Sequence, residues 1–434
     1  MKIGRTLLVL GVIFAGAVAA QAQANQPLIL VLEATGPITP PMAEYVGRGV
    51  QLAESRGAEA LLITLDTPGG DTRSLSNIIQ IMRASRVPII VYVAPNGAMA
   101  GSAGALVTMA AHAAAMAPEA VIGASSVVGS GGAELDPTIK AKETEILKAS
   151  VRPLVERRGA AATQLAQDMI DHAKAASASE ALDAKLIDWI ASSQADLLRQ
   201  MDGFTVTMPD GPKTLRTGGA VAEPVQMSLI EQLLLIVTDP NIVFILLSLG
   251  VLALQVELTH PGTWIPGFIG VTCLALAIYG LGVLPVNWFG LVFIVTAFVL
   301  FVLDIKAPTH GALTAAGVAS FIVGALVLFN SPGVPQFERV SVPLVIGVGV
   351  GIGLMFTGIL AFALRAQRLP IQMGKETVLG KIGIARSAVG LSGQVQVESE
   401  LWTAEAEQGS TAISKGDRVE VVEVRGVHLK VRKV

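Results

Sequence analysis

Five long apolar segments in the second half of the chain most constrain what it can fold into. Each approaches the about 20 residues that a helix needs to cross the hydrocarbon core of a membrane. The first segment is the shortest, and a buried core helix is the alternative for it. We expect a transmembrane domain of about five helices over residues 228–366, with apolar segments at residues 242–256, 264–284, 286–303, 312–329 and 342–364.

The N-terminus has the three parts of a secretory signal peptide. Lys2 and Arg5 precede an apolar stretch over residues 7–20, and Ala22-Gln23-Ala24 follows it. A basic region, a short apolar region and an Ala-x-Ala site together indicate export, and an uncleaved membrane anchor is the alternative. We therefore predict a signal peptide over residues 1–24 and a following domain outside the cytoplasmic (inner) membrane.

Charges between the apolar segments predict the orientation of the rest of the chain. An odd number of spans with an outside start ends in the cytoplasm, and basic residues gather on the cytoplasmic side. Arg339 falls in an outer loop, whereas the basic residues on the inner side are Lys306, Arg365, Arg368, Lys375 and Lys381. We expect a multi-pass protein in the lipid bilayer, with a cytoplasmic C-terminal domain, and the charges argue against four spans.

Composition narrows the classes of function. The chain has 434 residues, of which 52% are hydrophobic and 15% are charged, as expected for two or three domains that include a membrane part. A formal net charge of −3 gives no reason to expect nucleic acid as a partner. The single cysteine, Cys273, lies in an apolar segment, so a disulfide within the chain and a thiol metal cluster are excluded. We predict neither a metal nor a cofactor.

Residues 28–192 alternate short apolar runs with helical patterns, which is typical of a parallel sheet covered by helices. The predicted strands are residues 28–33, 60–65, 87–94 and 120–122, and the predicted helices are residues 39–55, 74–84, 100–114, 138–158 and 179–185. Residues 193–227 are more polar. Within them, residues 204–208 and 213–216 are predicted to pair as a hairpin. The stretch as a whole is predicted to be an end-piece of the domain and a tether ahead of the membrane.

Two glycine turns at the ends of apolar runs bracket a serine. Asp66-Thr67-Pro68-Gly69-Gly70 follows residues 60–65, and Gly97-Ala98-Met99-Ala100-Gly101-Ser102-Ala103-Gly104 follows residues 87–94. In a parallel sheet both turns lie at the carboxyl edge of the strands, where ligands bind in α/β folds. We therefore expect a site at this edge.

Ser102 has the surroundings of a nucleophile. Its small neighbours let a substrate backbone approach, and the start of the following helix offers free N–H groups to a developing oxyanion. Gly69 and Gly70 lack a Cβ and are predicted to point their N–H groups at the same oxygen, beside the N–H of Ala103. Tight packing of small residues between a strand and a helix is the alternative explanation of the serine string taken alone.

Together with Met116-Ala117-Pro118 and Ile122-Gly123-Ala124, the two turns resemble those of the NfeD-like, ClpP-class membrane-bound serine proteases, also called stomatin operon partner proteins. The resemblance covers most of the chain. It implies an α/β ClpP/crotonase-like catalytic domain with a Ser–Lys dyad, and a hydrophobic peptide substrate from the C-terminal region of a stomatin/prohibitin-type membrane partner. It also implies a homodimer or a higher homo-oligomer. Ser125-Ser126-Val127-Val128 departs from the family's pattern in the expected wall of the cleft.

The candidate serine needs a base, and the five histidines do not supply one. His112 lies ten residues beyond Ser102 on the same predicted helix, which puts it about 15 Å away at 1.5 Å per residue. His172 lies in a polar helical stretch, where a surface histidine is the better interpretation. A lysine is the remaining route to an activated serine.

Lys140, Lys142 and Lys148 cluster on the helix predicted over residues 138–158. A lysine acts as a base near neutral pH only when burial or a nearby cation lowers its pKa from about 10.4. The resemblance puts the family's lysine on Lys142, with Lys140 as the alternative because the preceding loop can shift by two residues. Lys148 is predicted to be a solvated charge.

The last part of the chain alternates short β-rich runs with turns, as in a small all-β OB-fold barrel. Leu401-Trp402-Thr403-Ala404 and Lys415-Gly416-Asp417-Arg418-Val419 resemble strings of the family's C-terminal module. Because stacking aromatics other than Trp402 are missing, a protein contact is a better prediction than nucleic-acid binding. The predicted strands are residues 377–379, 382–385, 394–398, 401–404, 418–424 and 428–431.

The predicted domain order is a signal peptide (1–24), a ClpP-like protease domain with a polar tether (25–227), a transmembrane domain (228–366) and an OB-fold domain (367–434). A membrane-anchored serine endopeptidase is the first functional hypothesis. The alternative is a non-catalytic membrane scaffold that organises a stomatin-like partner. A crotonase-like acyl-CoA enzyme is a third hypothesis, which export disfavours because CoA is cytoplasmic.

Overall fold

The fold is described from a computed structural model that covers residues 26–126, 136–259, 262, 264–307, 309, 311–330, 334, 339–367 and 378–434. The predicted signal peptide lies outside these residues. The chain divides into two compact units, Met1–Phe356 and Thr357–Val434.

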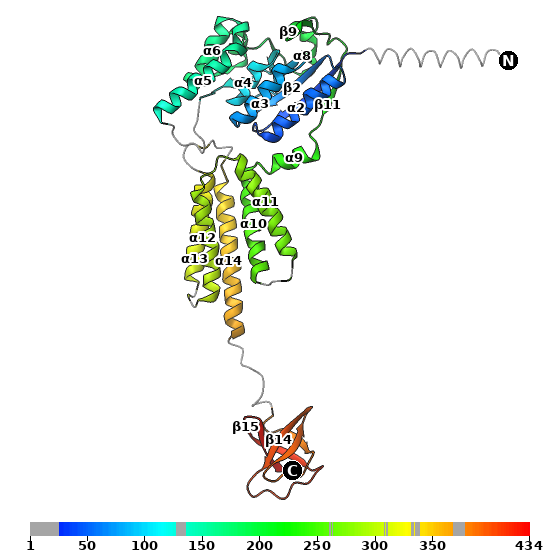
Figure 1. Cartoon of the computed structure of the whole chain (residues 1–434), viewed down its shortest axis with the longest axis vertical. Coiled ribbons are helices and arrows are strands. Elements are labelled where there is room, and N and C mark those ends of the chain that lie inside the picture. The colour runs from blue at the N-terminus through cyan, green and yellow to red at the C-terminus, as the bar shows by residue number, and fades with distance from the viewer. Residues whose placement is uncertain are drawn as a thin grey trace, which may run out of the picture. The chain divides into compact units, whose positions relative to one another are not determined.

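A six-stranded sheet forms the centre of the first unit. Its strand order is β11 (Val221–Val225), β1 (Leu28–Thr35), β2 (Ala60–Asp66), β3 (Ile89–Val93), β5 (Ala113–Met116) and β8 (Trp189–Ile190), and every neighbouring pair is parallel. The central strands are apolar runs whose side chains are buried, as expected for a sheet covered on both faces. The helices around it include α2 (Pro40–Ser55), α3 (Thr72–Ala84) and α4 (Ala103–Ala110) (Figure 1). The predicted parallel sheet is confirmed.

The stretch predicted as one helix over residues 100–114 has three parts instead. Met99–Gly101 is the short strand β4, α4 follows it, and Ala113–Met116 is β5, which lies between β3 and β8 in the main sheet. The prediction was wrong because alanine has a high helix propensity, whereas pairing of the run with the buried strand β3 overrides that preference. A second small sheet joins β4 to β6 (Val121–Gly123) and β7 (Ala175–Ser177).

Residues 193–227 form the end-piece of the domain around this sheet. The predicted hairpin is confirmed as β9 (Thr205–Met208) and β10 (Gly211–Thr214), but β11 also extends the main sheet beside β1. The Tyr45 hydroxyl of α2 donates a hydrogen bond to the carbonyl of Val225 at 2.5 Å, which ties β11 to the domain. The helices of this half are α5 (Pro137–Val155), α6 (Ala160–Asp171), α7 (Ala178–Asp183) and α8 (Gln194–Met201), with a 3₁₀ turn at Glu156–Arg158.

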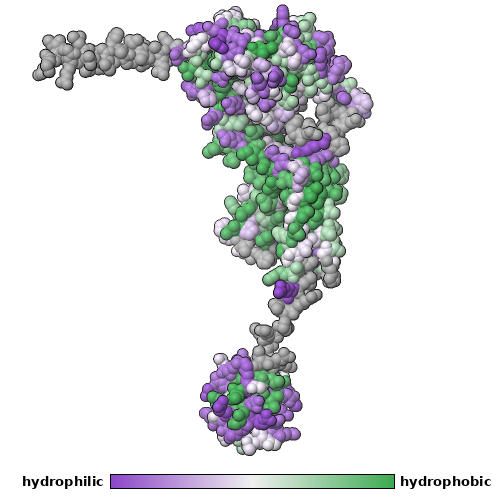
Figure 2. All heavy atoms as spheres, turned by 180° about the vertical axis from the view of Figure 1, so that it is seen from behind, coloured by the Kyte–Doolittle hydropathy of each residue, from purple (hydrophilic) through white to green (hydrophobic). Residues whose placement is uncertain are grey.

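A group of apolar helices follows the short helix α9 (Leu229–Ile236). It consists of α10 (Pro240–Thr259), α11 (Ile265–Val283), α12 (Phe289–Lys306), α13 (Ala312–Phe329) and α14 (Val342–Gln367). Among the described residues four of them are long and apolar enough to cross a membrane, whereas the apolar part of α12, Phe289–Asp304, is shorter. Figure 2 shows hydrophobic residues gathered over these helices and hydrophilic ones over the domain that holds the main sheet. The five-span topology stays a prediction.

The second unit contains a closed five-stranded barrel. Its order is β12 (Ile382–Ala385), β13 (Gly393–Val397), β14 (Glu400–Ala406), β16 (His428–Lys433) and β15 (Arg418–Arg425), which pairs back with β12. Only β14 and β16 run parallel among these pairs. The predicted small barrel is confirmed, except that Val378 and Leu379 lie in a turn instead of a strand.

Candidate active site

The two glycine turns meet at the carboxyl edge of the main sheet, as predicted. They follow β2 and β3, which are parallel neighbours. The N–H of Thr67 donates to the carbonyl of Met99 at 2.7 Å, and the N–H of Gly101 donates to the carbonyl of Thr67 at 2.8 Å. The carboxylate of Asp66 also accepts the N–H of Met99 at 3.0 Å. The first turn therefore fixes the residues that lead into Ser102.

Gly69 lies directly against the candidate nucleophile. A Cβ placed on Gly69 would stand 2.8 Å from the Cβ of Ser102 and 3.4 Å from its Oγ, and the φ of Gly69 is +127°. A separation of 2.8 Å is too short for two carbon atoms, and L side chains rarely adopt this φ. Glycine is therefore required here for the two turns to approach each other.

Ser102 occupies a strained turn between β4 and α4. Its φ is +48°, which is uncommon for a residue with a side chain. Its N–H donates to the carbonyl of Gly123 at 2.9 Å, and its carbonyl accepts the hydroxyl of Ser125 at 3.0 Å. Among the described residues the Ser102 Oγ has no hydrogen-bond partner. Hydrogen bonds thus fix the backbone of Ser102 through both its N–H and its carbonyl, whereas its hydroxyl has no partner among the described residues.

The N–H groups of Gly70 and Ala103 differ from that of Gly69 in having no acceptor among the described residues. Neither donates a hydrogen bond to any residue that the structure describes, and Ala103 opens α4, where the helix dipole is positive. The N–H of Gly69 differs, because it already donates to the Thr67 Oγ1 at 3.1 Å. Of the three predicted oxyanion donors, Gly70 and Ala103 therefore remain the better candidates, because the N–H of Gly69 is already used.

The two candidate lysines do not meet the serine in the described part of the chain. Lys140 and Lys142 lie exposed on the first turns of α5, and neither side chain has a hydrogen bond or an ion pair with a described residue. The buried residues of α5 are Val151, Leu154 and Val155, all in its C-terminal part. Lys148 pairs with Asp171 at 2.7 Å and with Glu145 at 3.1 Å, so two carboxylates hold its charge outside the serine turn.

The nearest histidine in the sequence has a structural role. His112 is buried at the start of β5, and its Nδ1 accepts the N–H of Ile89 at 3.0 Å. Burial, together with the positive charges of Arg157 and Arg83, lowers the pKa of His112 to about 4. It is therefore neutral at physiological pH, and it lies at the amino end of its strand, away from the turns at the carboxyl edge. No group of three metal-ligating side chains occurs among the described residues.

Sequence reasoning missed two side chains that hold the site. Thr67 accepts the Gly69 N–H through its hydroxyl, which in turn donates to the Gly69 carbonyl at 3.1 Å. Ser125 is buried and fixes the Ser102 carbonyl. The sequence placed Thr67 in the first glycine turn and Ser125 in a string that departs from the family's pattern, but it indicated no hydrogen bond for either side chain. Only their hydrogen bonds, which depend on the fold, reveal these roles.

Three family models match successive parts of the chain. The N-terminal domain of NfeD1b matches residues 30–205, the NfeD integral membrane domain matches residues 241–365, and the NfeD-like C-terminal, partner-binding domain matches residues 375–433.

Relatives also match over nearly the full length. A membrane-bound protease of Pyrococcus horikoshii is 32% identical over 93% of this chain and 92% of its own length. The membrane protein NfeD1b of Bacillus subtilis is 24% identical over 95% of this chain and 94% of its own. A solved structure described as the 1510-N membrane protease specific for a stomatin homolog from Pyrococcus horikoshii is 28% identical over 49% of this chain and 100% of that chain, with a TM-score of 0.43.

Proposed function

Because the chain belongs to the NfeD-like family of ClpP-class membrane-bound proteases, we propose that it is a membrane-anchored serine endopeptidase that cleaves hydrophobic peptide segments. The observation that carries the proposal is the strained Ser102 of the second glycine turn, packed against Gly69 of the first. Beside it, the N–H groups of Gly70 and Ala103 have no acceptor among the described residues. A free hydroxyl beside free backbone donors is the arrangement that acyl transfer to serine requires.

In the proposed reaction, the Ser102 Oγ forms a bond to the scissile carbonyl carbon while its proton passes to an uncharged lysine amine. The N–H groups of Gly70 and Ala103 stabilise the resulting oxyanion. The C–N bond then breaks, and the lysine returns the proton to the leaving amine. Water cleaves the acyl-serine by the same route, which regenerates the enzyme.

We assign the base to Lys142, with Lys140 as the alternative, on the family resemblance. A lysine with its free pKa of about 10.4 is charged at neutral pH, so the base must lose water contact before it can accept a proton. The N-terminal half of α5, which carries both lysines, is not covered by the described residues: Ile139 is 50% exposed and Ile146 is 60% exposed. Figure 1 shows α5 reaching out from the domain. We therefore propose that a homodimer or a higher homo-oligomer covers this half of the helix.

The proposed partner is a stomatin/prohibitin-type membrane protein. The matched model for residues 375–433 describes a partner-binding domain, and the family resemblance supplies the class of partner. We also propose that the catalytic domain lies outside the cytoplasmic membrane and the barrel inside, on the basis of the N-terminal signal-like segment and the distribution of basic residues.

Labelling by a fluorophosphonate probe and cleavage of a fluorogenic apolar peptide test the function on the full chain in detergent. Ser102→Ala should abolish labelling and lower cleavage at least about a thousandfold without a change in melting temperature. Lys142→Ala should lower both, whereas the surface variant Lys148→Ala is the matched control and should lower neither. Cleavage that persists in Ser102→Ala would refute the proposal.

The separation of both lysines from Ser102 favours the scaffold as the second candidate. A scaffold binds its partner without cutting it, so the wild-type protein would retain a stomatin-type protein on a column, would not react with the probe and would leave the peptide intact. The protease hypothesis predicts the opposite result for the last two measurements.

A further inference from the structure

The helix α9 exposes its apolar side and buries its polar side. Its exposed apolar residues recur at the spacing of one helical face and are between 53% and 77% exposed. They are Leu229, Ile230, Leu233 and Ile236, and we call them the apolar face of α9. Glu231 lies on the opposite side, buried in its ion pair with Arg48 of α2. A helix on the surface of a soluble domain has the reverse arrangement, so the apolar face indicates an apolar environment.

Contacts at both ends hold the apolar face in this direction. Near the start of α9, Arg48 donates to both carboxylate oxygens of Glu231 and to the carbonyl of Gln226 at 2.8 Å. Just beyond its end Val237 is buried, and the carbonyl of Val237 lies 2.5 Å from the position of a Cβ on Gly280 in the last turn of α11. The apolar face therefore cannot turn inward without breaking the contacts with α2 and with α11.

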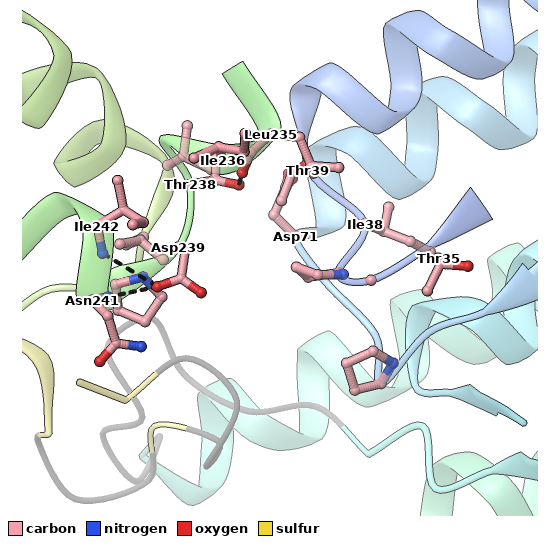
Figure 3. A pocket seen from close by; sticks show the side chains of 16 residues that line it. Thr35, Ile38, Thr39, Asp71, Leu235, Ile236, Thr238, Asp239, Asn241 and Ile242 are labelled. Atoms are coloured by element: carbon pink, nitrogen blue, oxygen red, sulfur yellow. Dashed lines mark hydrogen bonds between the residues drawn. The ribbon is translucent and has the colours of Figure 1, made fainter. Parts of the chain in front are cut away.

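The apolar face leads directly into a candidate membrane span. The helix α9 ends at Ile236, and the span of α10 begins at Pro240. Four steps of the chain cover at most about 14 Å. Asp239 caps the start of α10, because its carboxylate accepts the N–H groups of Asn241 at 2.8 Å and of Ile242 at 3.3 Å (Figure 3). The end of α9 is therefore fixed at the level where this span begins.

Exposed aromatic residues indicate a membrane surface at the same end of the helices. The position of a Cβ on Gly280 lies 2.3 Å from the side chain of Val243, so the end of α11 packs on the start of α10. Trp288 and Phe289 follow the end of α11 at Val283 by a few residues, and both are exposed. Tryptophan gathers where a bilayer meets water. The end of the helix group that carries α9 therefore has the features of a headgroup region.

We propose that the apolar face of α9 lies in the bilayer, at the boundary between the lipid headgroups and the acyl chains. A large exposed apolar patch marks either a membrane contact or a protein contact. Interfaces between proteins are enriched in aromatic residues and arginine, whereas this face is aliphatic throughout and continues into a span. Lipid is therefore the better occupant than a second copy of the chain. The inference does not depend on catalysis by Ser102.

An interfacial α9 has a consequence for the candidate site. Leu235 and Ile236 at the end of α9 line the same cavity as Ile38 and Asp71 at the carboxyl edge of the main sheet (Figure 3). The N–H of Ile38 donates to the carbonyl of Gly69 at 2.7 Å, and the N–H of Asp71 donates to the carbonyl of Ile38 at 2.9 Å. The edge that holds the first glycine turn therefore lies beside the helix that contacts the lipid.

Depth-dependent quenching tests the lipid contact in the full chain. Leu233→Cys is labelled with the fluorophore nitrobenzoxadiazole in a Cys273→Ala background, in phosphatidylethanolamine/phosphatidylglycerol nanodiscs. The nanodiscs also contain phosphatidylcholine with a quenching doxyl group, placed near either the carbonyl end or the methyl end of its acyl chain. Because an interfacial helix enters the bilayer by only about 5–10 Å, the carbonyl-end doxyl should quench at least about threefold more than the methyl-end doxyl.

The matched control is the same fluorophore on Asp210→Cys in the exposed β9–β10 turn, which neither doxyl lipid should quench. Water-like emission without quenching at position 233 would overturn the proposal. Blue-shifted emission without quenching would also overturn it, because protein and not lipid would then cover the face. Stronger quenching by the methyl-end doxyl would place α9 in the hydrocarbon core and refute an interfacial helix.

A charge on the apolar face gives a second test. In Leu233→Asp the carboxylate would lose contact with water, so hydrogen exchange in α9 should be at least about tenfold faster than in the apolar control Leu233→Met. If the face instead meets water, replacing an exposed leucine changes local stability little. Equal exchange rates for the two variants in nanodiscs would therefore contradict the lipid contact.

Discussion

Gly69 sets the position of Ser102 by contact, and this predicts a specific effect of adding one methyl group. In Gly69→Ala the new Cβ would stand 2.8 Å from the Ser102 Cβ, so one of the two turns must move. Reacting atoms displaced by about 1 Å cost about a hundredfold in rate. We therefore expect the rate of fluorophosphonate labelling to fall about a hundredfold while the protein stays folded.

Gly57→Ala is the matched control for backbone strain. Gly57 also has a positive φ, +61°, but a Cβ there meets no atom within 4 Å. Gly57→Ala costs about 1–2 kcal/mol from its left-handed φ. Gly69→Ala also meets a φ that L side chains rarely adopt, and it adds a clash at the serine. An equal loss of labelling in the two variants would show that general destabilisation, not displacement of Ser102, is responsible.

For individual residues, the sequence predicted the position of the serine and of the backbone N–H donors better than the surroundings of the candidate lysine. Ser102, Gly70 and Ala103 belong to strings fixed by local turn geometry, so their position at the sheet edge could be inferred. A partner for the Lys142 amine could not be inferred, because it depends on packing of α5 against residues far away in the chain or in another copy.

Among the elements, β5 is directly preceded by a titratable group, His112, whose burial predicts a pH dependence of stability. His112 has a folded-state pKa of about 4, below the unfolded value of about 6.5. The unfolded chain therefore binds the proton first, and stability is lost as the pH falls from about 6.5 to 4. A shift of this size corresponds to about 3 kcal/mol.

Thermal melts of the full chain between pH 7.5 and pH 4 measure this loss. Other groups also titrate in this pH range, so the wild type is compared with His112→Gln. The glutamine oxygen can still accept the Ile89 N–H, but the side chain does not titrate. The variant should melt lower at pH 7.5 and lose less stability on acidification than the wild type. Parallel curves for the two proteins would contradict a buried neutral histidine.

The helix α9 depends on one ion pair with the catalytic domain. Arg48 of α2 donates to both carboxylate oxygens of Glu231, at 2.8 and 2.7 Å, and these hydrogen bonds lower the pKa of Glu231. The Glu231 side chain is only 8% exposed, so its charge is costly without the arginine. Arg48→Ala should speed hydrogen exchange in α9 at least about tenfold.

Arg56→Ala is the control, because Arg56 makes a similar pair from the same helix with the exposed Glu223 of β11. Surface pairs contribute about 0–1 kcal/mol, so exchange in β11 should change little. If Arg48→Ala leaves α9 equally protected, apolar contacts rather than the ion pair hold this helix.

Elements of strong local pattern were predictable, and elements decided by distant pairing were not. The apolar runs of β1, β2 and β3 are bounded by turn residues and were located to within two residues at each end. By contrast, β5 was predicted as part of a helix and β11 was not predicted as a strand, because each is a strand only through its neighbour in the sheet. The barrel could be predicted from the sequence because its strands follow one another closely and are separated by recurring turns.

For the whole molecule, the number of spans decides whether the two soluble domains share a compartment. Four helices meet the length for crossing a membrane among the described residues, and α12 is shorter. If α12 also crosses, the catalytic domain and the barrel lie on opposite sides, as the basic residues predict. If it does not, both lie on the same side.

Single cysteines read by a membrane-impermeant maleimide distinguish the two topologies. With Cys273 replaced by alanine, Asp210→Cys reports on the β9–β10 turn and Leu391→Cys, at a residue that is 99% exposed, reports on the barrel. In intact spheroplasts we expect Asp210→Cys to react, and Leu391→Cys to react only after the membrane is permeabilised. Reaction of both cysteines in intact spheroplasts would mean an even number of crossings. A catalytic domain labelled only after permeabilisation would place Ser102 in the cytoplasm and make the acyl-CoA hypothesis tenable again, because CoA is present in that compartment.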